Sequence, residues 1–294
     1  RMTDPFARVK DAIADTLGAL LPQQSDIAQP MVDAMRHSVL GGGKRMRPLM
    51  ACATCEAFSG SFKAALPAAC GLEFIHAYSL IHDDLPAMDD DELRHGQAAT
   101  HVAFGEANAI LAGDSLHSLA FQALAEAPHL SHAAKLRCIS LLSTAAGWPG
   151  MAGGQCLDIA AEGQQLTLAR LEALHSAKTG ALIEASLVIG AYCAEVEPDN
   201  PRLTLLRTFG QRIGLAFQIV DDILDDTESS ETLGKPAGSD QALHKNTFPK
   251  LMGLAGAQQR AEALLAESLA LLKEADLATE LLTGLAERSV KRRH

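Results

Sequence analysis

Residues 64–91 read AALPAACGLEFIHAYSLIHDDLPAMDDD, an apolar stretch that ends in a cluster of aspartates. Up to residue 84 its apolar side chains recur at intervals of three and four residues, which is the spacing of one face of an α-helix. Residues 202–226, RLTLLRTFGQRIGLAFQIVDDILDD, repeat this arrangement. The sequence therefore predicts two apolar helices, each closed by a group of carboxylates.

The other long segments show the same helical periodicity, and no convincing run alternates with the period of a strand. The predicted helical segments are 31–59, 64–84, 104–126, 132–147, 168–195, 202–225 and 257–287. Turn signals such as 149–150 and 198–201 separate some of them, but none is long enough to link two domains. We therefore expect residues 1–294 to form a single all-α domain, a helical bundle.

Composition excludes several classes of protein. The net charge of −11 argues against a nucleic-acid-binding protein, which would need a broad basic face. We find neither a signal peptide nor a membrane span, because Glu184 interrupts the apolar run 181–194, and we expect a cytoplasmic protein. Cys52 and Cys55 have a C-x2-C spacing, but a zinc site needs two further ligands and no second pair is present.

Taken singly, each aspartate cluster would be a solvated surface, because runs of like charge are usually exposed. Two such clusters at the ends of apolar helices favour a shared metal site instead. Carboxylate oxygens are hard ligands that suit Mg²⁺ bound together with substrate phosphates. In the second cluster, Asp221 and Asp225 lie one turn apart on one face of a helix, with Gln218 on nearly the same stripe.

The first cluster is less simple. Asp89 follows Asp83 by six residues, which turns it about 120° away on a straight helix. Pro86 is expected to end or bend the helix between them. Either the loop after Leu85 brings Asp89 back, or Asp90, nearly in register with Asp83, takes its role. Spacing alone leaves both possibilities open.

Basic residues beside glycines could neutralise a polyphosphate. Lys44, Arg45 and Arg47 follow three glycines at 41–43, but Arg45 stands where a P-loop has the Ser or Thr that binds Mg²⁺. Further lysines with neighbouring glycines are Lys178 and Lys235, and Lys245 follows. Each by itself is typical of a surface lysine; together with the carboxylates they favour a diphosphate site.

In combination, these residues resemble the bacterial short-chain trans-prenyl diphosphate synthases, most of all the farnesyl diphosphate synthases. The similarity follows the family's order across roughly residues 30–265. Its motifs are GKRMRP at 43–48, HAYSLIHDD at 76–84 continuing to Gly96, GGQ at 153–155 with Asp158, KTG at 178–180, QIVDDILD at 218–225, and GK at 234–235 with Gly238 and Asp240.

The resemblance implies a helical bundle of the isoprenoid synthase type around a central cavity, and a homodimer. It implies a head-to-tail condensation of isopentenyl diphosphate with dimethylallyl or geranyl diphosphate, with three Mg²⁺ ions per site. The implied metal ligands are Asp83, Asp84 and Asp89 in the first cluster, and Asp221, Asp222 and Asp225 in the second. By analogy alone, Asp89 is thus preferred to Asp90.

The resemblance also implies roles for other residues. Arg94, Lys178 and Lys235, with the metal ligands Asp83, Asp89 and Asp221, form the implied catalytic set that stabilises the departing diphosphate. The implied substrate-binding residues are Lys44, Arg47, His76, His95, Thr179, Gln218 and Lys245. His82 is interpreted as a core residue.

Two positions bear on specificity. Tyr78, five residues before Asp83, resembles the aromatic floor that stops growth at farnesyl diphosphate. His95 departs from the family, which has a second Arg there, so we expect weaker binding of isopentenyl diphosphate. The basic tail 291–293 is a candidate compensator, although we favour its interpretation as a solvated terminus.

Other functions fit the residues less well. A geranylgeranyl diphosphate synthase is the main alternative. A terpene cyclase needs no second diphosphate pocket, which leaves Lys44 and Arg47 unexplained. A non-catalytic subunit of the same fold would be expected to lose one aspartate cluster, and a two-metal phosphohydrolase would leave Tyr78 without a role.

Overall fold

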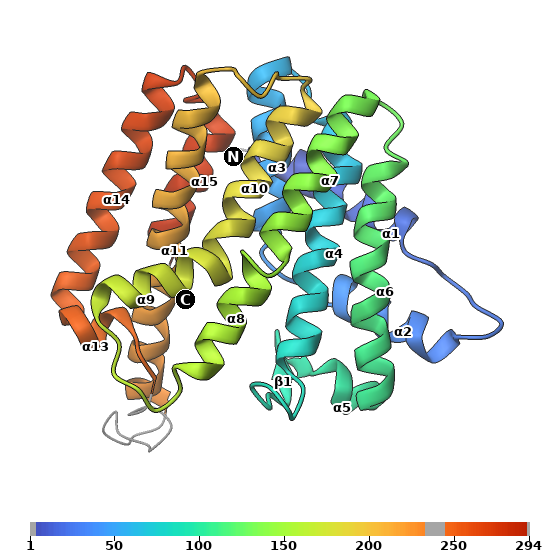
Figure 1. The fold of residues 1–294 in the computed structure, drawn as a ribbon, viewed down its shortest axis with the longest axis horizontal. Helices are drawn as coiled ribbons and strands as arrows, with labels where there is room; N and C mark the ends of the chain where they lie inside the picture. Colours follow the sequence, from blue (N-terminus) through green and yellow to red (C-terminus); the bar gives the residue numbers. More distant parts are fainter. Residues whose placement is uncertain (1–3, 233–244, 293–294) are drawn as a thin grey trace. The chain divides into compact units, whose positions relative to one another are not determined.

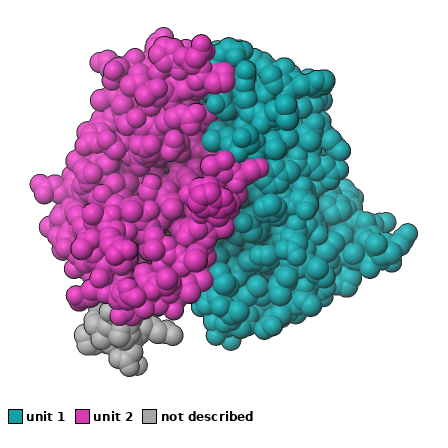
Figure 2. Space-filling view, in the orientation of Figure 1, with its two compact units in different colours: residues 1–141, 189–197 teal, residues 142–188, 198–294 magenta. Residues whose placement is uncertain are grey.

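The computed structural model describes residues 4–232 and 245–292, and for 229–232 the backbone alone. Within these residues the chain is helical apart from two short strands, β1 (Leu93–Arg94) and β2 (Gln97–Ala98), which pair as an antiparallel hairpin (Figure 1). The predicted all-α fold is confirmed. The chain forms two compact units, residues 1–141 with 189–197 (unit 1) and residues 142–188 with 198–294 (unit 2), coloured separately in Figure 2.

Unit 1 is built around one apolar helix. Its helices are α1 (Ala7–Leu20), α2 (Gln29–Leu40), α3 (Met46–Ser59), α4 (Leu66–Asp83), α5 (Thr100–Phe104), α6 (Glu106–Ala125) and most of α7 (His132–Ala146). Helix α4 packs against α1, α2, α3 and α6. Gly71 lets α6 come close, because a Cβ there would lie 3.0 Å from the carbonyl oxygen of Ala120.

The segment Lys63–Asp83, which contains α4, is long and apolar enough to cross a membrane by length and composition. However, 61% of its apolar window is buried inside the structure. Because Leu72, Phe74 and Ile75 are fully buried, this apolar character is accounted for by the core that α4 forms.

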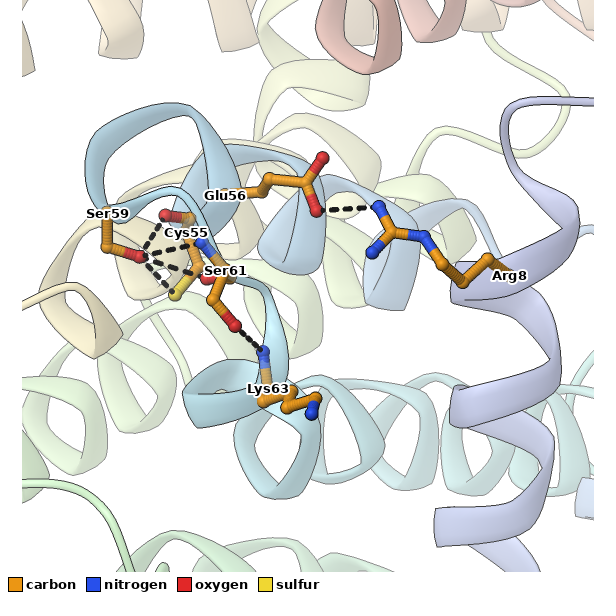
Figure 3. Close-up of polar contacts among 6 residues, drawn as sticks. All are labelled: Arg8, Cys55, Glu56, Ser59, Ser61 and Lys63. Carbon is orange, nitrogen blue, oxygen red and sulfur yellow. Dashed lines mark hydrogen bonds and ion pairs between the residues drawn. The ribbon is translucent and has the colours of Figure 1, made fainter.

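The turn between α3 and α4 is fixed by polar contacts (Figure 3). Ser59 Oγ donates to the carbonyl oxygen of Cys55 at 2.7 Å, and Gly60 then adopts the left-handed conformation that ends many helices. Arg8 of α1 donates to Glu56 of α3 at 3.1 Å (Figure 3). These contacts hold α1 and α3 in place beside the start of α4.

Unit 2 is built around α11 (Arg202–Thr232), which packs along α14 (Leu254–Glu274) and α15 (Glu280–Val290). Its other elements are α8 (Met151–Ala160), α9 (Leu168–His175), a π-helical turn (Ser176–Gly180), the first part of α10 (Ala181–Cys193) and α13 (Phe248–Met252). Ile219 of α11 and Phe248 are fully buried in its core. Each unit thus centres on the helix that carries one aspartate cluster.

Candidate active site

The first aspartate cluster folds back on itself. Helix α4 ends at Asp83, and after Pro86 the chain returns so that the N–H of Asp89 donates to the carbonyl oxygen of Asp83 at 2.8 Å. The N–H of Asp90 donates to the carbonyl oxygen of Leu85 at 3.1 Å, and Asp90 itself has a positive φ of 55°. Of the two arrangements that spacing left open, the chain adopts the one that brings Asp89 back to Asp83.

Asp84 is held by an arginine and is only 2% exposed. One of its oxygens accepts from Nε of Arg94 at 3.2 Å, and the other accepts from Nη2. Arg94 lies in the hairpin, whose two turn residues, His95 and Gly96, have φ values of 50° and 74° as a type I′ turn requires. Because both oxygens of Asp84 have protein donors, its geometry suits bracing the cluster better than the predicted metal binding.

The basic motif before α3 divides into two kinds of residue. Arg45 donates to Glu73 at 2.9 Å and to the carbonyl oxygen of Val39 at 2.6 Å, so its guanidinium stabilises the fold. Lys44 is exposed and Arg47 is half-buried. The two predicted substrate ligands in this motif, Lys44 and Arg47, thus differ in how far they are exposed.

Four predicted site residues influence one another in unit 1. Burial, followed by the charges of Arg47, Arg94 and His95, lowers the pKa of His76 well below its usual value. Burial and the charge of Arg94 also lower the pKa of His95. His95 lies against the glycine loop, since a Cβ on Gly43 would be 3.8 Å from its Nε2. Both imidazoles are thus neutral at pH 7 beside two arginines.

Aromatic rings gather one turn before the first cluster. The ring of Tyr78 contacts His82 of α4 and His117 of α6 edge-on, at centroid distances of 5.6 and 5.0 Å. His117 in turn lies 5.2 Å from Phe121. His82 is also fixed by the carbonyl oxygen of Ile110, 3.0 Å from its Nε2, but its side chain is 27% exposed, so it is not the core residue that was expected. Sequence reasoning missed His117 and Phe121, because only their helical spacing marks them.

The second cluster lies on a continuous helix. Asp222 is 7% exposed, and its oxygens accept from Nε2 of Gln218 at 3.0 Å and from the N–H of Phe248 at 3.1 Å. Burial raises its pKa to about 6, despite the opposing effect of these two hydrogen bonds. Gln218, predicted to line the path of the cation, thus uses its amide N–H to brace Asp222.

Asp221 has an arginine partner that the sequence did not indicate. Nη1 of Arg292, just after α15, donates to Oδ1 of Asp221. The side chain of Arg292 is only 10% exposed, so its interpretation as part of a solvated terminus is wrong. Desolvation and the charge of Asp221 raise the pKa of Asp225, whereas the charge of Lys245 lowers it. Lys245, a predicted substrate ligand, therefore lies close enough to Asp225 to influence its charge.

The predicted residues Lys178 and Thr179 stand in the π-helical turn, a conformation frequent at functional sites. Lys178 Nζ donates to Oδ2 of Asp158 at 2.5 Å. Gly154 of α8 permits this approach, because a Cβ there would be 2.3 Å from the backbone nitrogen of Lys178. Burial lowers the pKa of His175, which precedes the turn, to about 4.

The predicted residues thus form two groups, one in each unit. Lys235 lies outside the described residues. Within the described residues, no three His, Cys, Asp or Glu side chains converge closely enough to hold a metal ion by themselves. The donors are nevertheless carboxylate oxygens, which fit Mg²⁺ where substrate phosphates and water complete the coordination.

Comparison with known proteins gives consistent results. The family model described as polyprenyl synthetase matches residues 28–281. The chain is 47% identical to the farnesyl diphosphate synthase of Escherichia coli, over 90% of this chain and 89% of that protein. It is 48% identical to a large subunit of the heterodimeric geranylgeranyl pyrophosphate synthase of Arabidopsis thaliana, over 79% of this chain and 64% of that protein. The solved structure of an FPP/GFPP synthase from Zymomonas mobilis superposes with a TM-score of 0.84 at 37% identity, over 96% of each chain.

Proposed function

Because the chain belongs to the polyprenyl synthetase family and is a prenyltransferase, we propose that it makes farnesyl diphosphate. In this reaction isopentenyl diphosphate adds head-to-tail to dimethylallyl diphosphate and then to geranyl diphosphate. Each addition forms one C–C bond, breaks the allylic C–O bond to release diphosphate, and ends with loss of a proton, which the released diphosphate accepts. The observation that carries the proposal is the pair of complete aspartate clusters, each with its own basic residues. Relatives named farnesyl diphosphate synthase, which match most of this chain, support it.

Mg²⁺, when bound, would supply Lewis-acid stabilisation of charge on the departing diphosphate. Asp83 and Asp89 would hold it in the first cluster, and Asp221 and Asp225 in the second. The support for this assignment is that all four side chains offer carboxylate oxygens, the ligands that Mg²⁺ prefers, and that all four are more exposed than Asp84 and Asp222.

The allylic diphosphate needs cationic partners as its C–O bond breaks. Arg94, Lys178 and Lys235 are proposed for this role. Arg94 and Lys178 are each oriented by a carboxylate, Asp84 and Asp158 respectively, which fixes the direction of their remaining N–H groups. Preorganised donors of this kind stabilise developing charge without reorganising during the reaction.

Isopentenyl diphosphate is proposed to bind to Lys44, Arg47, His76 and His95. The lowered pKa values of both histidines favour the neutral imidazole, whose N–H can donate a hydrogen bond to a phosphate oxygen while Lys44 and Arg47 supply charge. Orientation of its double bond toward the allylic cation would then supply much of the rate. Thr179 would present an oxygen dipole to that cation.

Product length is proposed to be set by Tyr78, with His117 and Phe121 behind it. The Tyr78 ring on α4 contacts the exposed His117 ring on α6, which contacts Phe121, and the growing prenyl chain is proposed to extend toward Tyr78. A geranylgeranyl diphosphate synthase is the second candidate, because a relative with that activity in its name is 48% identical to this chain. The aromatic floor favours the shorter product.

The assay that tests this function uses Mg²⁺, isopentenyl diphosphate and dimethylallyl diphosphate. Elongation to farnesyl diphosphate, abolished by chelation of the metal, is the expected result. A cyclic hydrocarbon would identify a terpene cyclase, free phosphate alone a phosphohydrolase, and inertness a non-catalytic subunit. We also propose a cytoplasmic homodimer, which light scattering on the purified protein would detect as twice the chain mass of 31.1 kDa.

A further inference from the structure

The C-terminal segment contributes a side chain to the second aspartate cluster. Arg292 follows α15, which packs against α11, the helix that carries Asp221. Its guanidinium donates from Nη1 to Oδ1 of Asp221 and from Nη2 to the carbonyl oxygen of Phe217 at 2.8 Å. Nε donates to the carbonyl oxygen of Ser289 at 3.3 Å. All three nitrogens of Arg292 are therefore engaged.

The guanidinium is also held from one side by a ring. Its central carbon lies 4.0 Å from the centroid of Phe217, within the range of a cation–π interaction. The side chain is 10% exposed, whereas that of Asp221 is 33% exposed. Exposed ion pairs contribute little, but a buried guanidinium with three acceptors and an aromatic face has one well-defined position.

Only one oxygen of Asp221 is used by this contact. In the described part of the chain, Oδ2 accepts no hydrogen bond, so the more exposed carboxylate is fixed at one oxygen and open at the other. Carboxylates that bind metals are commonly oriented by a hydrogen bond of this kind. We propose that Arg292 is a positioning residue for the second cluster, which holds Asp221 so that Oδ2 faces the Mg²⁺ of the proposed function.

A different role would give the opposite result. If Arg292 were only a counter-ion that a metal displaces, its removal would strengthen metal binding, because a competing positive charge would be lost. As a positioning residue, its removal weakens metal binding, because the carboxylate loses its orientation. Displacement would break the three hydrogen bonds and the ring contact at once, which favours the positioning role.

The experiment measures Mn²⁺ binding to the full chain by electron paramagnetic resonance, with inorganic diphosphate present. We expect Arg292→Gln to raise the Mn²⁺ dissociation constant by about 10- to 100-fold. Arg292→Lys should also raise it, because an ammonium keeps the charge but cannot reproduce the planar fork. Lys291→Gln, the exposed neighbour, removes the same charge and should change the constant by less than about twofold.

Unchanged or tighter Mn²⁺ binding in Arg292→Gln would overturn the proposal, as would a wild-type chain that binds no Mn²⁺. Thermal unfolding without metal shows which variants are folded. If Arg292→Gln does not fold, the Mn²⁺ dissociation constant of Arg292→Lys is compared with that of the wild type instead. The inference rests on the proposed function, but the two fail separately. A chain that binds Mn²⁺ through this contact and elongates no substrate would refute only the function.

Discussion

The two aspartate clusters share a pattern but are braced differently. In each cluster the second aspartate, Asp84 or Asp222, is buried, and both of its oxygens accept hydrogen bonds from protein donors. The other proposed metal ligands are more exposed. Asp84 is braced by the charged guanidinium of Arg94, whereas Asp222 is braced by the neutral amides of Gln218 and Phe248. The compensating arginine in the second cluster is instead on the first aspartate, Asp221.

This difference determines where negative charge is costly. A buried carboxylate paired with a guanidinium keeps its charge, but one with only neutral donors is stabilised in its protonated form. Burial accordingly raises the pKa of Asp222 to about 6. The first cluster therefore depends on the ion pair between Arg94 and Asp84. In the second cluster, the buried environment of Asp222 favours the protonated carboxyl over the carboxylate.

The largest expected effect comes from removing each brace. Arg94→Ala leaves Asp84 buried without its cation, which should cost about 3 kcal/mol of unfolding free energy. It also removes a donor to the departing diphosphate, so kcat should fall about 10²- to 10³-fold. Gln218→Ala removes one neutral donor and should cost only about 1 kcal/mol. Denaturant unfolding and steady-state kinetics measure both; equal stability losses would contradict the distinction.

Neutralising the buried aspartate should change the stability of the protein in opposite directions in the two clusters. Because the folded-state pKa of Asp222 is above its unfolded value, the folded state binds the extra proton, and stability falls as pH rises from about 4 through 6. Asp222→Asn should remove this fall and stabilise the protein at pH 8 by about 1–3 kcal/mol. Asp84→Asn should destabilise it. Chemical denaturation of both variants at several pH values tests this, and Asp222→Asn less stable than wild type at pH 8 would refute it.

The clusters also differ in what precedes them. Tyr78 lies five residues before Asp83, whereas the corresponding position before Asp221 is Ala216, which is fully buried in the core. Only the first cluster therefore has a large side chain at this position whose truncation could lengthen the product. Tyr78→Ala should shift the main product from farnesyl to geranylgeranyl diphosphate, and His117→Ala should shift it less. Chromatography of the dephosphorylated products gives the readout; an unchanged product length would remove Tyr78 from this role.

The smallest effect is expected at the hairpin of the first cluster. His95→Arg restores a permanent cation beside the glycine loop and should lower the Michaelis constant for isopentenyl diphosphate about fivefold, equivalent to about 1 kcal/mol. The constant for the allylic substrate serves as the internal control and should not change. No change for isopentenyl diphosphate, or a rise, would show that the neutral imidazole already binds as well.

Local periodicity predicted the helices that carry the clusters, and 132–147 matches α7 almost to the residue. It missed the breaks inside the predicted segments 31–59, 168–195 and 257–287, as well as several elements. The segment 257–287 is two helices, α14 and α15, separated near Asp276, which has a positive φ without the Gly or Pro that would signal it. Helices α1, α8 and α13 were also missed, although Val9, Ile13 and Leu17 of α1 have the four-residue spacing of a helical face.

For the candidate site, spacing predicted the shared face of Asp221 and Asp225 and the bend at Pro86. It did not predict which carboxylates are braced. Arg94 contacts Asp84, which is 10 positions away in the sequence, and Arg292 contacts Asp221, which is 71 positions away. The second contact forms because α15 packs on α11. Such pairs are set by tertiary packing, which a local pattern does not contain.

The central claim is that both clusters serve one elongation reaction that stops at a defined length. The most direct test incubates the wild-type chain with Mg²⁺, geranyl diphosphate and excess isopentenyl diphosphate, and measures the distribution of products over time. We expect farnesyl diphosphate to accumulate and persist as the main product. Continued conversion to geranylgeranyl diphosphate, or no elongation at all, would contradict it.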